Sequence, residues 1–304
     1  MKLARLFATG AVAFAVGACV SLEGLVSGQN DDPGGEPNQV DPYAGQGSSG
    51  SGRSPGGSGS ASSSSSSSGA GTSSDSGSPP PPPCPGKPLP PGVWVGSYCV
   101  DSTEVTNFQY DAFLNDVGPT PAAGSQPAEC AFNTSYAPNS LRGPPGFPVT
   151  AVNWCQAHAY CKWAGKRLCG SIGGGSVDPK TVAWKDPNVD QWHRACTFAG
   201  TRVYPYGGTY LPTACNGSDV SAQQVAVPVM TYPKCEGGYS GIFDMSGNVR
   251  EWEDSCDGAV GEADRCRTRG GAADNGQLHL TCDHDESYDR SYTSFRTGFR
   301  CCSL

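Results

Sequence analysis

The sequence predicts one disulfide-rich domain in which short strands and short helices are joined by long irregular loops. Fifteen cysteines occur in 304 residues, and fourteen of them lie from position 84 onward. An even number permits complete pairing in an oxidising compartment, although spacing cannot give the connectivity. Short apolar segments in the same region alternate with stretches rich in Gly, Pro, Ser and Asn, which are typical of loops. The roughly 220 residues concerned are enough for one sizeable core.

The first 19 residues have the pattern of an export signal. Lys2 and Arg5 precede a short apolar run over residues 6–16, which is too short for a typical membrane span. The small residues before Cys19 resemble a bacterial lipobox, so we expect Cys19 to be lipidated and to anchor an extracytoplasmic protein. Val20 gives no signal for inner-membrane retention, which favours the outer membrane. An ordinary signal peptide with a chance cysteine is the alternative.

Residues 20–83 are expected to form a disordered tether before a domain spanning residues 84–304. Residues 47–78 are almost entirely Ser and Gly, and a proline run follows at residues 79–83. Such a segment buries too little apolar surface to offset the entropy of ordering. The segment is either a spacer that separates the domain from a membrane or a low-complexity sequence that has not been selected for any role. The net charge of -8, without basic clusters, argues against a nucleic-acid partner.

The first half of the domain is expected to contain one strand, one helix and a long loop. Aromatic and β-branched residues over 93–100 predict the strand. Thr106 or Asn107 can cap the helix that follows, which we expect to be covered on much of its surface because its apolar residues form no single stripe. The loop spans residues 117–148 and is expected to be stapled by Cys130.

The second half is expected to contain further short elements around an irregular insertion. Asn153 can cap a helix over residues 154–164, and Gly165 suits its end. The remaining expected segments are a strand at 148–152, an irregular insertion at 170–189, a short helix at 191–196 and a closing strand at 295–302.

Residues 241–252 form the most informative stretch of the chain, because glycines, acids, an amide and large apolar residues are interleaved there. Gly241 and Gly247 allow the backbone to bend. Asp244, Asn248 and Glu251 then offer oxygen ligands on a curved backbone, which suits calcium. The alternative is a hydrophobic turn with solvated acids, since the pattern is not an EF-hand loop.

Five segments together resemble the formylglycine-generating enzyme (sulfatase-modifying factor) family. They occur in the family's order and lie at residues 103–107, 148–168, 247–252, 269–271 and 298–301. The resemblance covers roughly residues 90–304. It implies an α+β domain related to the C-type lectin fold, with little regular secondary structure.

The resemblance also implies calcium ligands. The family's structural site would be formed by the side chains of Asp244 and Glu251 and the backbone oxygens of Gly247 and Val249. A second site would begin at Asn216 and Gly217. Its later ligands would fall near residues 221–223, where the spacing is shorter, and Asp219 is a possible substitute.

The family's oxidase site is not reproduced. True oxidases of the family carry two thiols after the Arg-Gly-Gly motif, and paired thiolates suit Cu(I). A gapless alignment places Asn275 and Leu280 at the two thiol positions. A shifted alignment brings Cys282 to the first position but places Asp289 at the second. Cys282 is therefore the single candidate for a catalytic thiol, and we expect it to lie in a disulfide instead.

A zinc or iron site is an alternative use of the same segment. Its ligands would be drawn from His279, Cys282, His284, Asp285 and Glu286. Side chains that are neighbours on a loop rarely converge on one ion unless the surrounding structure positions them.

Three functions follow as hypotheses. The first is a non-catalytic, calcium-stabilised module that binds a protein, peptide or glycan at the cell surface. The second is a copper-dependent oxidase that converts a cysteine of a sulfatase-like protein to formylglycine at an altered site. The third is a purely structural role on the envelope. Membership of a fold family does not decide between them.

Overall fold

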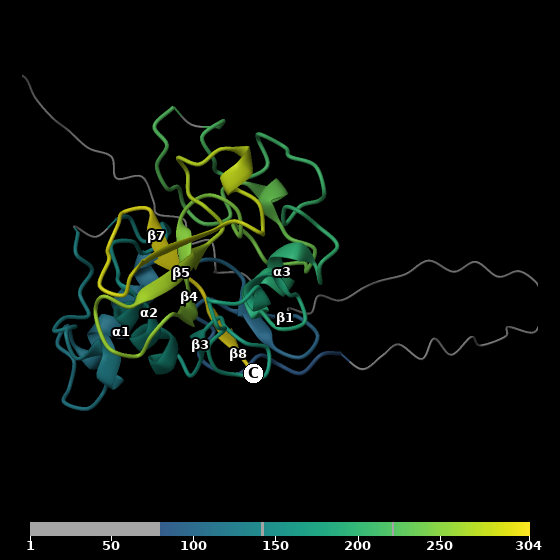
Figure 1. Cartoon of the computed structure of the whole chain (residues 1–304). Helices are drawn as coiled ribbons and strands as arrows, with labels where there is room; N and C mark the ends of the chain where they lie inside the picture. The colour runs from purple at the N-terminus through teal and green to yellow at the C-terminus, as the bar shows by residue number, and fades with distance from the viewer. Residues whose placement is uncertain (1–79, 141–142, 221) are drawn as a thin grey trace, which may run out of the picture. The chain divides into compact units, whose positions relative to one another are not determined.

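The computed structural model describes residues 80–140, 143–220 and 222–304. The predicted signal, the tether up to position 79 and Cys19 lie outside these residues. Figure 1 shows short elements joined by long loops, as the sequence predicts. The helices are α1 (Asn107–Val117), α2 (Trp154–Trp163) and α3 (Gln191–Thr197), and single 3-10 turns lie at Ala128–Cys130, Ala183–Lys185, Pro233–Cys235 and Gln277–His279. No helix in the described ranges is long and apolar enough to cross a membrane.

The strands form two small sheets. The first has the order β1 (Gly92–Trp94), β2 (Cys99–Asp101), β8 (Cys301–Ser303) and β3 (Arg167–Leu168). The second has the order β6 (Asp285–Asp289), β5 (Arg265–Arg269), β4 (Arg250–Cys256) and β7 (Thr297–Phe299). Only the β4–β7 pair among these is parallel. The first sheet therefore joins segments from both ends of the domain, whereas the second is built from strands that lie within residues 250–299.

Three predicted strands are wrong in the same way, because the chain changes partners within each of them. The segment 93–100 turns at Gly96 (φ +87°) and gives the β1–β2 hairpin. The segment 295–302 divides at Arg300, which separates β7 in one sheet from β8 in the other. Residues 148–152 form no strand, since Val149 N–H bonds to Val105 O and Ala151 N–H to Ser294 O.

The predicted helix starts are confirmed. Thr106 and Asn153 are the N-caps of α1 and α2, and each forms a capping box with a glutamine three residues later. Gly165 follows α2 with φ +71°. However, α1 is not covered all round, because Phe108 is 64% exposed while Tyr110, Phe113 and Leu114 are buried.

All fourteen cysteines from position 84 onward are paired. The disulfides are Cys84–Cys99, Cys130–Cys155, Cys161–Cys301, Cys169–Cys302, Cys196–Cys282, Cys215–Cys235 and Cys256–Cys266. The Cys130 bridge fastens the long loop to α2, as expected. The adjacent residues Cys301 and Cys302 face different apolar clusters, one around α1 and α2 and the other around α3. Strand β8 is therefore covalently joined to both parts of the core.

Candidate functional site

The stretch 241–252 forms a tight turn that leads into β4. Asp244 and Asn248 have φ values of 60°, and Gly247 has φ +77°, so the backbone is left-handed at three nearby positions. A Cβ atom at Gly247 would lie 2.2 Å from the backbone oxygen of Asn216. Only glycine allows this approach, and it presses the turn against residue 216.

The two predicted acidic ligands are both buried, and both are engaged by the protein. Arg300 donates to Oε2 of Glu251 from Nε and to Oε1 from Nη2, each at 2.7 Å. Trp192 Nε1–H also donates to Oε2. One oxygen of Asp244 accepts the N–H of Met230 at 2.6 Å. A carboxylate has about four lone-pair positions, so these bonds leave room for a cation on the same groups.

Glu104 joins this pair and was not among the predicted ligands. Its side chain is fully buried, one oxygen accepts Asn248 Nδ2–H at 3.1 Å, and Oε2 has no hydrogen-bond partner among the described residues. Burial, together with the charges of Asp244 and Glu251, raises the pKa of Glu104 well above its usual value. Burial also raises the pKa of Asp244, to about 6.

The chemistry of this cluster fits a hard cation. Three buried carboxylates face one buried guanidinium, Arg300, so their ionised forms carry excess negative charge that a divalent cation would balance. Carboxylate and backbone oxygens are the ligands that calcium prefers. In the described ranges no three His, Cys, Asp or Glu side chains form a recognisable metal cage. The expected ligand set does not require one, because Gly247 and Val249 would contribute backbone oxygens.

The second predicted site lies against the first. Asn216 Nδ2 donates to Asn248 Oδ1 at 3.0 Å, and the backbone oxygen of Asn216 accepts the Asn248 N–H at 2.8 Å. The buried Oδ1 of Asn216 has no hydrogen-bond partner in the described part of the chain. Asp219, the suggested substitute, accepts a hydrogen bond from Tyr210 OH at 2.9 Å. Residue 221 lies outside the described residues.

Leu280 occupies one of the two positions at which the gapless alignment expects a catalytic thiol. Its side chain is buried and packs against two glycines. A Cβ atom at Gly217 would lie 2.5 Å from Leu280 Cδ1, and one at Gly271 would lie 3.2 Å from Cδ2. Asn275, at the other position, accepts the Ala272 N–H at 2.8 Å. In the gapless alignment, an apolar side chain and an amide therefore stand at the positions of the thiol pair.

Cys282 forms a disulfide with Cys196 of α3, as expected, and is fully buried. The alternative zinc or iron set is wrong as a five-residue site, because this disulfide removes Cys282 and an ion pair with Arg267 engages Asp285. His279 and His284 remain close together, with ring centroids 4.7 Å apart.

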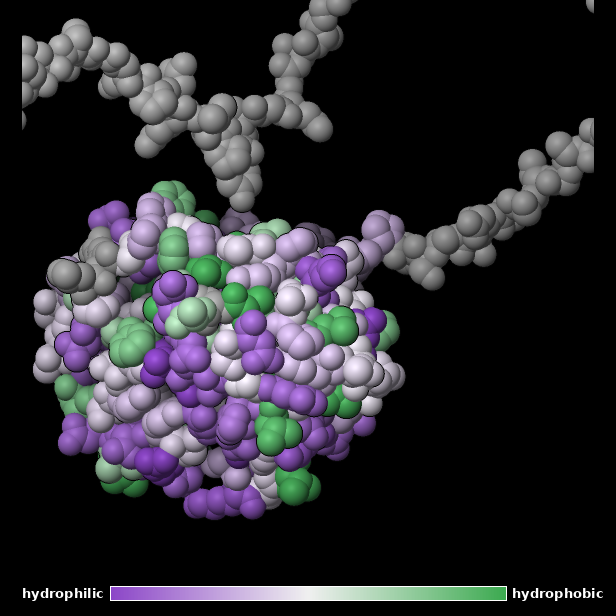
Figure 2. All heavy atoms as spheres, turned by 90° about the horizontal axis from the view of Figure 1, so that it is seen from above, coloured by the Kyte–Doolittle hydropathy of each residue, from purple (hydrophilic) through white to green (hydrophobic). Residues whose placement is uncertain are grey.

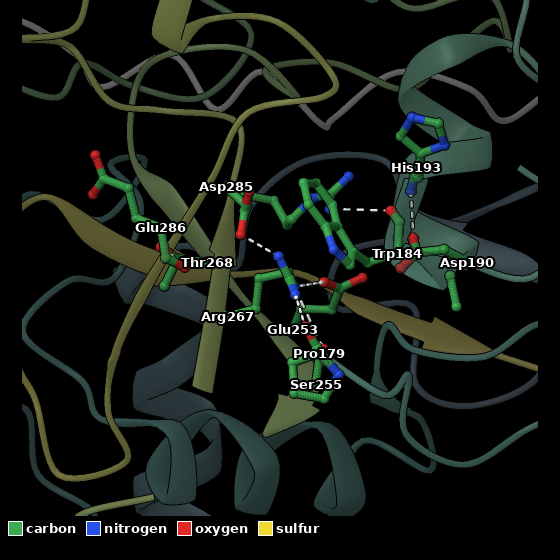
Figure 3. A network of polar contacts seen from close by, with 12 residues as sticks. Pro179, Trp184, Asp190, His193, Glu253, Ser255, Arg267, Thr268, Asp285 and Glu286 are labelled. Atoms are coloured by element: carbon green, nitrogen blue, oxygen red, sulfur yellow. Dashed lines mark hydrogen bonds and ion pairs between the residues drawn. The ribbon is translucent and has the colours of Figure 1, made fainter. Parts of the chain in front are cut away.

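A network of buried polar side chains on β4 and β5 contacts residues 282–285 (Figure 3). Arg267 and Arg269 of β5 reach this segment, Arg267 through Asp285 and Arg269 through the backbone oxygen of Cys282 at 3.0 Å. The indole of Trp184 lies against both guanidinium groups. Glu253 is fully buried nearby, and burial is the main reason that its pKa is raised well above the usual value. Residues 282 and 285 are thus each bonded to an arginine of β5.

Comparison with known proteins agrees with this architecture. The family model described as "Sulfatase-modifying factor enzyme 1-like domain" matches residues 70–303. The chain belongs to this family. The family assignment agrees with the observed fold, which has little regular secondary structure and contains seven disulfides.

Relatives with different names and activities match parts of the chain. The "Inactive C-alpha-formylglycine-generating enzyme 2" of Bos taurus is 31% identical over 117 residues, covering 35% of this chain and 32% of that protein. The "Formylglycine-generating enzyme" of Mus musculus is 30% identical over 120 residues, covering 34% and 26%. The "Hercynine oxygenase" of Mycolicibacterium smegmatis is 27% identical over 181 residues, covering 53% and 38%. The chain therefore spans a quarter to two-fifths of these three proteins.

A solved structure of similar architecture is PvdO from Pseudomonas aeruginosa. It matches with a TM-score of 0.48 and 18% identity, covering 68% of this chain and 80% of that one.

Proposed function

We propose that the domain is a calcium-stabilised binding module that lacks the oxidase activity of the family's enzymes. The observation that carries the proposal is Leu280, whose buried side chain fills the space between Gly217 and Gly271. Copper-dependent oxidation in this family requires two neighbouring thiols. Every cysteine from position 84 onward is instead in a disulfide, and Cys282 is bonded to α3 rather than to a second cysteine of its own segment.

The alternative is that the protein is a formylglycine-generating oxidase with an altered site. Its support is the family assignment and the similarity to the murine enzyme. The similarity to the "Inactive C-alpha-formylglycine-generating enzyme 2" of Bos taurus supports the non-catalytic proposal to the same degree. The alternative would need copper and a thiol pair that includes Cys282 after reduction of its disulfide.

A mass-spectrometric assay distinguishes the two. The full chain would be incubated with copper, a mild reductant, oxygen and a peptide that carries the Cys-x-Pro-x-Arg sequence recognised by the family's oxidases. We expect no conversion of thiol to aldehyde, with an active family enzyme run alongside. Turnover by the native chain that disappears in Cys282→Ser would contradict the proposal.

A matched variant tests the reason for the missing activity. Asn275→Cys combined with Leu280→Cys places two thiols at the positions given by the gapless alignment. Because nothing else in the segment changes, any turnover gained by this variant would identify the missing pair as the cause.

Loops of distant sequence offer a binding surface, which we call the loop face. It is formed by residues 198–220 and 270–284, joined by hydrogen bonds from Cys282 N–H to Val203 O and from Ser218 N–H to Asn275 O. Viewed from above, apolar residues there are scattered singly among polar ones (Figure 2). Val203, Leu211 and Leu278 are each about half exposed or more. A protein, peptide or glycan ligand would therefore be recognised by polar contacts with single apolar anchors.

Calcium removal gives a second test. If Asp244 and Glu251 bind calcium, excess chelator should lower the melting temperature, because the buried carboxylates lose their counter-ion. In Asp244→Ala the same chelator should change little. Asp116→Ala, at an exposed carboxylate that accepts a hydrogen bond from Trp163 and lies outside both predicted calcium sites, is the acidic control and should keep the native sensitivity. A native melting curve that does not respond to chelator would exclude the site.

Membrane anchoring through Cys19 is part of the proposal. Cys19 lies outside the residues that the structure describes. Seven disulfides support an extracytoplasmic location. Cys19→Ser should release the protein from the membrane fraction, and the acylated N-terminal peptide can be identified by mass spectrometry.

A further inference from the structure

Two of the four histidines of the chain lie side by side on the loop face. His279 ends a 3-10 turn and is exposed, and His284 immediately precedes β6 with 17% of its side chain exposed. Their rings are 4.7 Å apart, centroid to centroid. The disulfide of Cys282 lies between them in sequence and fixes the backbone that carries both.

The carboxylate of Glu286 lies next to His284 and is held in place by other side chains. Nε2 of His284 lies 3.5 Å from Oε1 of Glu286. The other oxygen of Glu286 is 2.6 Å from Arg250 Nε and also accepts the hydroxyl of Tyr288.

We propose that His279 and His284 bind a late first-row divalent cation such as Zn²⁺ or Cu²⁺, with Glu286 positioning His284. Imidazole nitrogens suit these ions, whereas calcium takes oxygens, so the site is chemically distinct from the carboxylate cluster. With Zn–N bonds of about 2.0 Å, two imidazoles on one tetrahedral ion have centroids roughly 5 Å apart. The observed 4.7 Å is compatible with this distance. The two rings meet edge to face at 89°, so the exposed His279 ring has to rotate before both imidazoles bind one ion.

The contact with Glu286 assigns the two nitrogens of His284. Because Nε2 is next to the carboxylate, Nδ1 is the nitrogen left to bind the ion in the proposed site. A carboxylate behind a metal-binding histidine orients the ring and raises its basicity. The chain supplies two ligands, in keeping with the lack of a group of three such side chains in the described ranges. The remaining coordination positions are open to water or to a ligand group of a bound partner.

Calorimetric titration of the full chain with Zn²⁺ tests the proposal. The protein would carry Cys19→Ser, so that no thiol competes, and saturating Ca²⁺ would be present to occupy oxygen sites. We expect one ion per chain and loss of this binding in His279→Ala and in His284→Ala. Glu286→Gln should weaken binding about 10–100-fold, as for other residues behind metal-binding histidines. His158→Ala is the matched control, since His158 stacks on Trp154 elsewhere in the domain, and should leave binding unchanged.

A second measurement distinguishes the loss of a metal ligand from misfolding of the variant. Because His279 is exposed, His279→Ala should keep the native melting temperature, so lost binding in this variant reports a lost ligand. In proton NMR, Zn²⁺ should shift the ring resonances of two histidines and leave those of His158 unchanged. Full binding by both alanine variants, or no heat and no shift at millimolar Zn²⁺, would overturn the proposal and leave the pair as a stacking contact.

Discussion

Removing both disulfides of β8 is expected to destabilise the domain by more than twice the effect of removing either one. Cys161–Cys301 and Cys169–Cys302 span 140 and 133 residues, so either bridge closes nearly the same long loop. While one bridge remains, the other closes only a ring of about ten residues in the unfolded chain. Removing that bridge should lower the free energy of unfolding by about 3 kcal/mol, because the unfolded chain gains entropy. Removing the second then opens a loop that Cys196–Cys282 shortens to roughly 50 residues, at a further cost of about 4 kcal/mol.

Urea unfolding of paired cysteine-to-alanine variants measures this difference. The control combines removal of Cys161–Cys301 with removal of Cys256–Cys266, which closes a separate ten-residue hairpin. Because these two loops are independent, their costs should add. If the losses of unfolding free energy were also additive for the two β8 bridges, loop closure would not be the source of their stabilising effect.

The features that the sequence predicted correctly are local ones. The caps at Thr106 and Asn153 depend on a side chain and a backbone N–H three residues away, so the pattern is visible without knowing the fold. The same holds for Gly247, where a bend of the backbone was expected and the φ value is +77°. The fold class was predictable because five short segments, each uninformative alone, recur in a known order.

The errors arise where distant segments decide the outcome. The closing strand divides because Arg300 turns inward between β7 and β8 to meet Glu251. Glu104 was missed as a member of the acidic cluster because its neighbours come from residues 244–251. The one local signal was an acid placed between Thr103 and Val105 in a segment that is otherwise buried. Sequence spacing can suggest the ligands on one turn, but not a ligand that another turn supplies.

Arg300→Met is expected to destabilise the domain by about 3–5 kcal/mol, the cost of leaving one partner of a buried ion pair without its charge. Arg300 is fully buried and donates to both oxygens of Glu251 and to the backbone oxygens of Asp101 and Phe243. The exposed pair of Arg265 and Asp289, each about half exposed, provides the control. Arg265→Met should change the unfolding free energy by less than about 1 kcal/mol.

The same variant connects stability to the proposed calcium site. Without Arg300, three buried carboxylates have no cationic partner in the cluster, so a bound divalent cation becomes their only positive charge. The loss caused by Arg300→Met should therefore be larger in chelator than in saturating Ca²⁺, and the difference should shrink when Asp244→Ala is added. An equal loss in both conditions would mean that no cation binds at these carboxylates. Glu104, whose pKa burial raises well above its usual value, would then be buried as a neutral acid.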